Sequence, residues 1–267
     1  MKVTNIILAG AMALTIASCS NNNANKLDAC GCASITDQNS EDFKKCKELR
    51  TADAKFEADY QKCKIASASG IEDTSKVSLN KGNTTGAIKP VEAGIYTIDP
   101  ATSSIGWIGE KVTGKKHNGS VAVKSGSFKL ENGVLKSGEI IIDMKSINDE
   151  DLTGEAKTKL ETHLKSDDFF ASAKHPEAKY VIKSATVKDN IQYEIVGDLT
   201  VKGITKEMPA KLVIAPNGTG ASIAGAIVFN RAQFDVRYGS DSFFDNLGDE
   251  MIKDEVILKV LLKAKRS

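Results

Sequence analysis

Hydrophobic and polar residues alternate along most of the chain from Gly94 onward, and this period of two predicts β-strands. The predicted strands are residues 95–99, 105–110, 117–123, 125–130, 138–144, 178–188, 192–201, 205–215, 221–230 and 255–264. Turn signals separate these runs, and Asn132-Gly133 is the strongest because this pair favours a two-residue hairpin. We therefore expect an all-β domain, an antiparallel barrel or sandwich of about eight strands.

Two stretches depart from the strand pattern and predict helices. Residues 154–165 carry three apolar residues spaced four apart, so one face of a short helix is apolar, and Thr153 precedes it as a candidate N-cap. Nearer the N-terminus, the Ser-Glu-Asp sequence at residues 40–42 is typical of a helix start. Apolar residues at steps of three and four then predict that this helix continues to about Lys64.

The first 18 residues predict a secretion signal, because Lys2 is followed by an apolar run that is too short to span a bilayer. Ile16-Ala17-Ser18-Cys19 resembles the lipobox of bacterial lipoproteins, in which the cysteine thiol is acylated and becomes the mature N-terminus. An ordinary signal peptide is the alternative. We expect lipid attachment at Cys19 and a location in the bacterial cell envelope. The uncharged residues 20–25 favour a periplasm-facing outer-membrane anchor over the cell surface.

Four further cysteines, Cys30, Cys32, Cys46 and Cys63, are disulfide candidates, because export implies an oxidising compartment. A zinc site is the alternative, although the spacing of these cysteines matches no familiar zinc finger. In an unbroken helix Cys46 and Cys63 would lie about 26 Å apart. Cys46 and Cys63 could then not both form bonds to the closely spaced Cys30 and Cys32 unless the helix folded back on itself. The disulfide connectivity therefore stays open.

Composition divides the chain into four parts. After the signal at residues 1–18, we expect an anchored segment at 19–65 with the cysteine-bearing helix. Residues 66–93, rich in Ser, Gly, Thr, Asn and Lys, predict a flexible linker, and residues 94–267 form the β domain. The net charge of +1 gives no electrostatic argument for nucleic acid as a partner.

Catalytic motifs are missing from the sequence. Its three histidines, His117, His163 and His175, show no metal-binding spacing, no Gly-x-Ser-x-Gly motif occurs, and the β domain has no cysteine. Residues 149–151, Asp-Glu-Asp, are expected to be a solvated acidic turn. We therefore expect no catalytic residue, no metal and no enzymatic activity. An enzyme acting on a bound lipid would need His117 or His163 beside a cavity with a carboxylate partner.

Several motifs of the β domain are specific when taken together and in order. They are Tyr96-Thr97-Ile98-Asp99-Pro100 with Ser104-Ile105-Gly106-Trp107, His163-Leu164-Lys165-Ser166-Asp167-Asp168-Phe169-Phe170, residues 176–182, and residues 197–205. Over about residues 94–265 the chain resembles the YceI family. The resemblance implies a lipocalin-like, eight-stranded antiparallel barrel that holds a long apolar ligand. Members of this family are associated with polyisoprenoid chains, including quinone-type lipids.

In such a barrel, inward-facing apolar residues would form the wall of the ligand site. These are Trp107, Ile140, Ile142, Met144, Tyr180, Ile195, Leu199, Phe229 and Leu258. Two aromatic pairs beside acidic residues, Phe169-Phe170 and Phe243-Phe244, would gate the opening. The alternative is a core filled by side chains, in an interaction module for another envelope protein.

The predicted function is a membrane-anchored protein that carries or sequesters an isoprenoid-tailed lipid of the quinone or polyprenol class. Its partners would be that lipid and, through acylated Cys19, the membrane. It would require no cofactor other than the bound lipid. The oligomeric state, a homodimer included, stays open.

Overall fold

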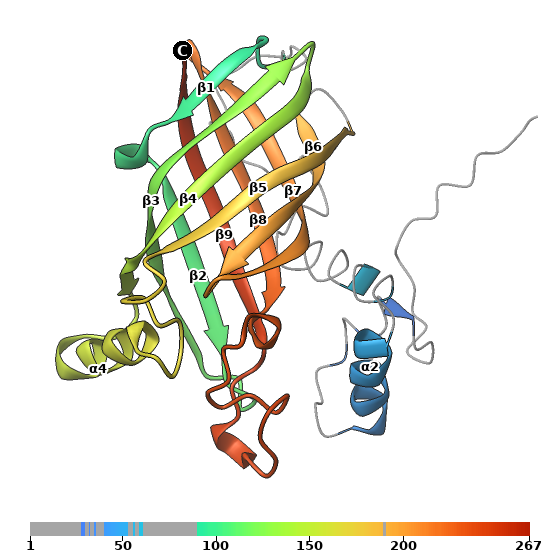
Figure 1. Ribbon diagram of the computed structural model, residues 1–267, viewed down its shortest axis with the longest axis vertical. Coiled ribbons are helices and arrows are strands. Elements are labelled where there is room, and N and C mark those ends of the chain that lie inside the picture. Colours follow the sequence, from blue (N-terminus) through green and yellow to red (C-terminus); the bar gives the residue numbers. More distant parts are fainter. Residues whose placement is uncertain are drawn as a thin grey trace, which may run out of the picture.

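The computed structural model describes residues 28–29, 32, 35, 40–52, 56, 59–60, 90–188 and 191–267 (Figure 1). The predicted signal peptide, Cys19, Cys30, Cys63 and most of the predicted linker 66–93 lie outside the described residues. Among the helices of the described part, none is both long enough and apolar enough to cross a membrane.

Nine strands between Gly94 and Arg266 form one antiparallel sheet within the described residues. They are β1 Gly94–Ile98, β2 Ser104–Glu110, β3 Lys116–Glu131, β4 Val134–Asp149, β5 Glu177–Val187, β6 Gln192–Val201, β7 Ile204–Asn217, β8 Gly220–Asn230 and β9 Glu255–Arg266. Pairing of β3 with β4 closes the sheet into a barrel (Figure 1). Both β1 and β2 lie between β3 and β9, one after the other along the wall. The wall is therefore eight strands around, which confirms the predicted barrel.

The strands follow from the alternation in the sequence. In β6 the inward residues, from Tyr193 to Val201 at every second position, are buried, and the residues between them are not. Runs 117–123 and 125–130 are one strand, β3, because register shifts near Val123 and Ser125 absorb the break in alternation. At the β3–β4 hairpin, Asn132 and Gly133 have φ of 50° and 73°, as a two-residue turn requires.

Helix α4, Gly154–Lys165, matches its predicted bounds and lies at the end of the barrel where β4 ends (Figure 1). Its Leu164 is buried against the core. Thr153 has the backbone conformation of an N-cap, but its side chain makes no capping hydrogen bond. The chain enters the helix through Asp149 instead, whose Oδ1 accepts the Leu152 N–H at 2.7 Å.

The end of the barrel opposite α4 is packed with side chains. Tyr96 stacks on Phe128 with ring centroids 5.0 Å apart, and the Tyr193 hydroxyl donates to the Gly133 carbonyl at 2.9 Å. Deeper inside, the Tyr180 hydroxyl donates to the Met208 carbonyl at 2.7 Å. The ring of Tyr180 lies on Gly197, where a Cβ would come within 2.5 Å of it. Only glycine therefore allows the ring to occupy this position.

The N-terminal helix α2 spans Glu41–Ala52 and begins as predicted, with Ser40 Oγ accepting the Phe43 N–H at 3.2 Å. The prediction of an unbroken helix to about Lys64 is wrong. The Arg50 guanidinium lies 3.8 Å from the centre of the Tyr60 ring. In a straight helix, the Cα atoms of these two residues would lie about 15 Å apart along the axis, too far for this contact. The chain therefore folds back after α2, although the sequence has no Gly or Pro there to indicate a break.

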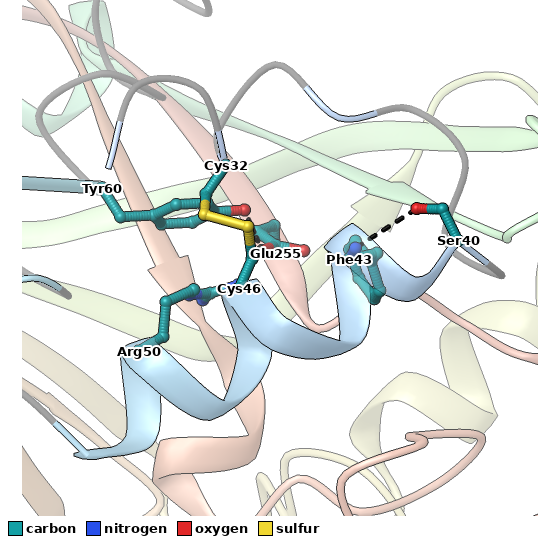
Figure 2. Close-up of a disulfide and its surroundings, with 7 residues drawn as sticks. All are labelled: Cys32, Ser40, Phe43, Cys46, Arg50, Tyr60 and Glu255. Atoms are coloured by element: carbon teal, nitrogen blue, oxygen red, sulfur yellow. Dashed lines mark hydrogen bonds and ion pairs between the residues drawn. A yellow bond between two sulfur atoms is a disulfide. The ribbon is translucent and has the colours of Figure 1, made fainter. Parts of the chain in front are cut away.

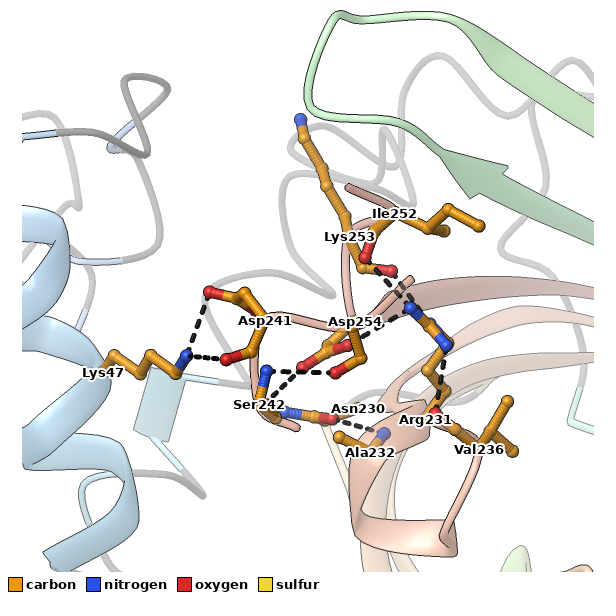
Figure 3. Close-up of polar contacts among 11 residues, drawn as sticks. Lys47, Asn230, Arg231, Ala232, Val236, Asp241, Ser242, Ile252, Lys253 and Asp254 are labelled. Atoms are coloured by element: carbon orange, nitrogen blue, oxygen red, sulfur yellow. Dashed lines mark hydrogen bonds and ion pairs between the residues drawn. The ribbon is translucent and has the colours of Figure 1, made fainter. Parts of the chain in front are cut away.

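A disulfide joins Cys32 to Cys46 in α2, and Tyr60 is buried against it (Figure 2). The N-terminal segment also contacts the barrel. Arg50 and the Tyr60 hydroxyl both reach Glu255 Oε1, at 2.9 and 2.8 Å. Lys47 Nζ lies 2.9 Å from Asp241 Oδ2 (Figure 3). These contacts join the segment to the start of β9 and to the β8–β9 connection.

Candidate functional site

A cavity of about 870 Å³ occupies the part of the barrel nearest α4 and opens at that end. Its inner wall is apolar. Of the predicted wall and gate residues, those that line it are Trp107, Ile142, Met144, Phe169, Phe170, Leu199, Phe229, Phe244 and Leu258. The barrel is therefore hollow at one end and packed at the other.

Four predicted residues do not line the cavity. Tyr180 and Ile195 are buried in the packed core, and Ile140 packs against that core. Phe243 lies on the outside with 39% of its surface exposed, and the Arg237 guanidinium lies 5.0 Å from its ring centre. Alternation identified the inward face of each strand, but not the height at which the core ends and the cavity begins.

Trp107 takes its place in the cavity wall because a glycine faces it. Its indole Nε1 donates to the Ser120 carbonyl at 3.3 Å, and its ring covers Gly119 on the neighbouring strand β3. A Cβ at position 119 would come within 2.7 Å of the indole and 2.0 Å of the Asn148 carbonyl oxygen. Any larger residue at Gly119 would displace the ring or separate the strands.

The turn after α4 brings an aromatic group to the cavity mouth. The Phe169 and Ala171 N–H groups both donate to the Ser166 carbonyl, and Ala171 has a φ of 48°. This tight turn directs Phe169 into the barrel, where it is 7% exposed. The His163 ring packs edge-on against both Phe169 and Tyr238, with centroids 5.5 and 4.3 Å apart. Helix α4 and the β8–β9 connection thus meet at the mouth.

Arg231, at the end of β8, organises the β8–β9 connection from inside (Figure 3). It is 1% exposed, and its guanidinium donates to the carbonyls of Val236, Ile252 and Lys253 at 3.0, 3.0 and 3.2 Å. It also lies 3.5 Å from Asp254 Oδ1 and faces the Phe169 ring at 5.4 Å. We call residues 231–254 the mouth loop, since this single side chain holds its two ends together.

Burial works against both charges of this pair. It lowers the pKa of Arg231, an effect that Asp254 partly offsets. Burial likewise raises the pKa of Asp254, while hydrogen bonds from Ser242 and Ser240 act in the opposite direction. Ser242 Oγ donates to Asp254 Oδ2 at 2.6 Å. Sequence reasoning missed Arg231, because an arginine after a strand resembles an exposed end residue until the loop has closed over it.

The rim of the cavity carries charges of both signs, and several of them pair with each other. Lys111 reaches Glu250 at 2.6 Å, and Lys253 reaches Glu110 at 2.8 Å. Since these side chains neutralise one another, the rim selects weakly for the charge of a ligand, and the apolar interior dominates the site.

His117 and His163 both line the cavity. His117 Nδ1 lies 2.8 Å from Asp151 Oδ2, so a histidine with a carboxylate partner does occur at the mouth. The expectation of a solvated acidic turn at residues 149–151 is wrong for Asp149, whose exposure is 0%. The strand-to-helix connection buries it, because its N–H donates to Glu161 Oε1 at 2.9 Å and its carboxylate caps Leu152.

Comparison with known proteins agrees with the barrel and its motifs. The model of the YceI-like domain family matches residues 96–264. The chain belongs to the YceI-like family. A "UPF0312 protein" of Shewanella denitrificans is 29% identical over 118 residues, 42% of this chain and 60% of that protein. The chain thus matches less than two thirds of the length of this relative.

Two solved structures are similar to the chain. BcnA of Burkholderia cenocepacia is 22% identical with a TM-score of 0.51, and the match covers 63% of this chain and 99% of BcnA. A polyisoprenoid-binding domain from Saccharophagus degradans is 13% identical with a TM-score of 0.49, over 66% and 100% of the two chains. The likeness to BcnA shows a shared fold.

Proposed function

We propose that this protein binds a lipid with an isoprenoid tail, of the quinone or polyprenol class, and carries or sequesters it in the barrel. The observation that supports this proposal is the apolar cavity of about 870 Å³, closed at one end and open at the other. Its volume lies in the upper part of the range of about 300–1,000 Å³ that is typical of small-molecule sites. A cavity with one opening suits a chain that enters tail first.

The physical basis of binding would be burial of the apolar tail. Each methylene removed from water contributes about 0.8 kcal/mol, so a few isoprene units suffice for tight binding. The polar head would remain at the mouth, near His163 and Tyr238, which line the opening. An interaction module with a filled core is the weaker candidate, because side chains leave this end of the barrel hollow.

Two further parts of the proposal rest on sequence. Acylation at Cys19 would anchor the protein in the bacterial cell envelope, with a periplasm-facing outer membrane as the proposed location. Several acyl chains together would hold it there firmly. The protein would act by binding rather than by catalysis, and turnover of a bound lipid that is lost in His117→Ala or His163→Ala would contradict this.

The test is uptake of a defined lipid by the purified, delipidated protein. We expect it to retain ubiquinone or a polyprenol through gel filtration, with the lipid quantified by mass spectrometry. Ala178, buried in the cavity wall, is the site for a blocking change, since Ala178→Phe places a ring inside the cavity. Ala101→Phe, the same change at an exposed residue of the short 3-10 helix Pro100–Thr102, is the matched control.

Retention should fall by at least about tenfold in Ala178→Phe and stay unchanged in Ala101→Phe. A wild-type protein that purifies empty and takes up neither lipid would exclude the carrier function and favour the interaction module. Equal uptake by both variants would place the lipid outside the cavity.

A further inference from the structure

Three potential metal ligands meet beside the cavity mouth, on strand ends that the barrel brings together. His117 is near the start of β3 and Asp149 ends β4, two strands that pair at Gly119 and Asp149. Asp151 follows two residues later, before α4. One ligand atom from each of the three side chains lies within 4.8 Å of the other two. Barrel closure thus brings the His117 imidazole together with two carboxylates that follow it 32 and 34 residues later in the chain.

Asp149 provides an independent sign that a cation belongs here. Its exposure is 0%, and Oδ1 accepts the Leu152 N–H. Oδ2 is buried, and within the described residues no donor forms a hydrogen bond with it. A buried carboxylate oxygen without a partner is costly, and proteins normally satisfy such an atom with a donor, a proton or a metal ion.

The surrounding charge adds to this demand. Glu161 Oε1 lies 2.9 Å from the Asp149 nitrogen, so a third carboxylate borders the group. Lys157 Nζ lies 3.6 Å from Glu161 Oε1, and the charges of Lys157 and Lys165 both offset this carboxylate. Three carboxylates and two ammonium groups still leave a net negative charge around His117, which favours a divalent cation.

The other two side chains are accessible from solvent. The His117 and Asp151 side chains are 23% and 28% exposed, and His117 lines the cavity. Asp151 is already held in place, because its Oδ1 accepts the Asn118 N–H at 2.8 Å while its Oδ2 faces His117. A cation could therefore enter from the mouth and meet a preformed carboxylate–imidazole pair with a buried carboxylate behind it.

We propose that His117, Asp149 and Asp151 form a binding site for a divalent transition-metal ion such as Zn²⁺. Imidazole and carboxylate ligands suit Zn²⁺ at bond lengths of about 2.0–2.2 Å, which correspond to about 3.4 Å between donor atoms in a tetrahedron. Rotation of the two accessible side chains would shorten the longer separations, which are up to 4.8 Å, and would open the 2.8 Å contact between His117 Nδ1 and Asp151 Oδ2 to admit the ion. A fourth position, unoccupied by protein, would face the mouth. The proposal does not depend on the lipid-carrier function.

The test is titration of the full-length, chelator-stripped protein with Zn²⁺ alone, by isothermal calorimetry in a buffer that does not bind metal. We expect saturable binding of about one ion per chain, and a loss of affinity of at least about tenfold in both His117→Ala and Asp151→Asn. These two side chains are partly exposed, so the variants should fold, as circular dichroism would show. His175→Ala and Asp168→Asn, the same changes outside the cluster, should bind like the wild type.

Cobalt substitution gives a second readout. Co²⁺ in this site should produce visible absorption typical of nitrogen and oxygen ligands, and the bands should disappear in Asp149→Asn. Absence of Zn²⁺ and Co²⁺ binding by the wild type would overturn the proposal, leaving a proton shared by Asp149 and Asp151 as the solution to the buried oxygen. Binding that persists in His117→Ala/Asp151→Asn would overturn it too, because the ion would then lie elsewhere.

Discussion

Replacing Arg231 by methionine should destabilise the barrel more than any comparable change at its surface. Methionine fills a similar volume but removes the donors to the Val236, Ile252 and Lys253 carbonyls, and it leaves Asp254 buried without its cation. Removing one partner of a buried ion pair typically costs about 3–5 kcal/mol. We expect a loss of this size in the free energy of unfolding, since carbonyls that lose their donors add to the cost while relief of the buried arginine charge reduces it.

The assay is urea denaturation followed by fluorescence of Trp107, the only tryptophan, which lines the cavity. The matched control is Arg237→Met in the same mouth loop. Arg237 pairs with Asp235 at 2.6 Å, but its side chain is 60% exposed, so the loss there should be below about 1 kcal/mol. The double variant Arg231→Met/Asp254→Asn should recover part of the loss, because it removes the unpaired buried charge as well.

Hydrogen exchange provides a local check. In Arg231→Met, exchange over residues 236–253 should accelerate, because the guanidinium no longer joins the two ends of the mouth loop. If Arg231→Met and Arg237→Met cost the same free energy, or if Arg231→Met stabilises the protein, the inferred role of this side chain is wrong.

Three further predictions follow from other contacts. The Cys32–Cys46 disulfide spans a sequence separation of 14 and stabilises the segment that it closes by about 3 kcal/mol. Cys46→Ser should therefore accelerate hydrogen exchange in α2 while the midpoint of barrel unfolding in urea stays unchanged. A shift of that midpoint corresponding to the same loss of about 3 kcal/mol would contradict this local role. Burial raises the pKa of Tyr180 above its usual 10.0, so the free energy of unfolding of the wild type should fall as the pH rises above about 10. In urea titrations at alkaline pH, Tyr180→Phe should lack the part of this pH dependence that comes from the tyrosine hydroxyl. The hydrogen bond from the Asp149 N–H lowers the pKa of Glu161 below its usual 4.5. The stability that the Glu161 charge contributes is therefore present above pH 4.5 and is lost as the pH falls through the lowered pKa. The difference in free energy of unfolding between wild type and Glu161→Gln, measured in urea, should shrink over that range, and a constant difference would contradict this role.

Much of the fold could be predicted because local rules and tertiary structure agree. The strands of the second half, such as β6 at residues 192–201, and helix α4 at residues 154–165 have the predicted bounds or nearly so. Each is a run of regular alternation or helical spacing between turn residues. The prediction of one unbroken helix was wrong: residues 56, 59 and 60 are helical, but the packing of Tyr60 on Arg50 and on the Cys32–Cys46 bond requires the chain to reverse, and no Gly or Pro indicates this in the sequence.

The candidate site could be predicted only in part. Alternation identified inward residues such as Ile142 and Leu199, which line the cavity, but it equally selected Tyr180 and Ile195, which fill the core. Whether an inward side chain faces a void or a neighbour depends on what the other seven positions around the wall contribute at that height. A pattern along one strand does not contain this information.

The sequence by itself determined the strand periodicity, the all-β class, the short helix and the family, because each depends on residues close together in the chain. The tertiary structure alone decided where the barrel is hollow, why Arg231 is buried, and which side chains surround Asp149. These depend on groups brought together by barrel closure, such as His117 and Asp149, whose proximity is set by the pairing of β3 with β4. Burial then changes the chemistry of each group, since an arginine or carboxylate that would be ordinary in water must find a partner inside the protein.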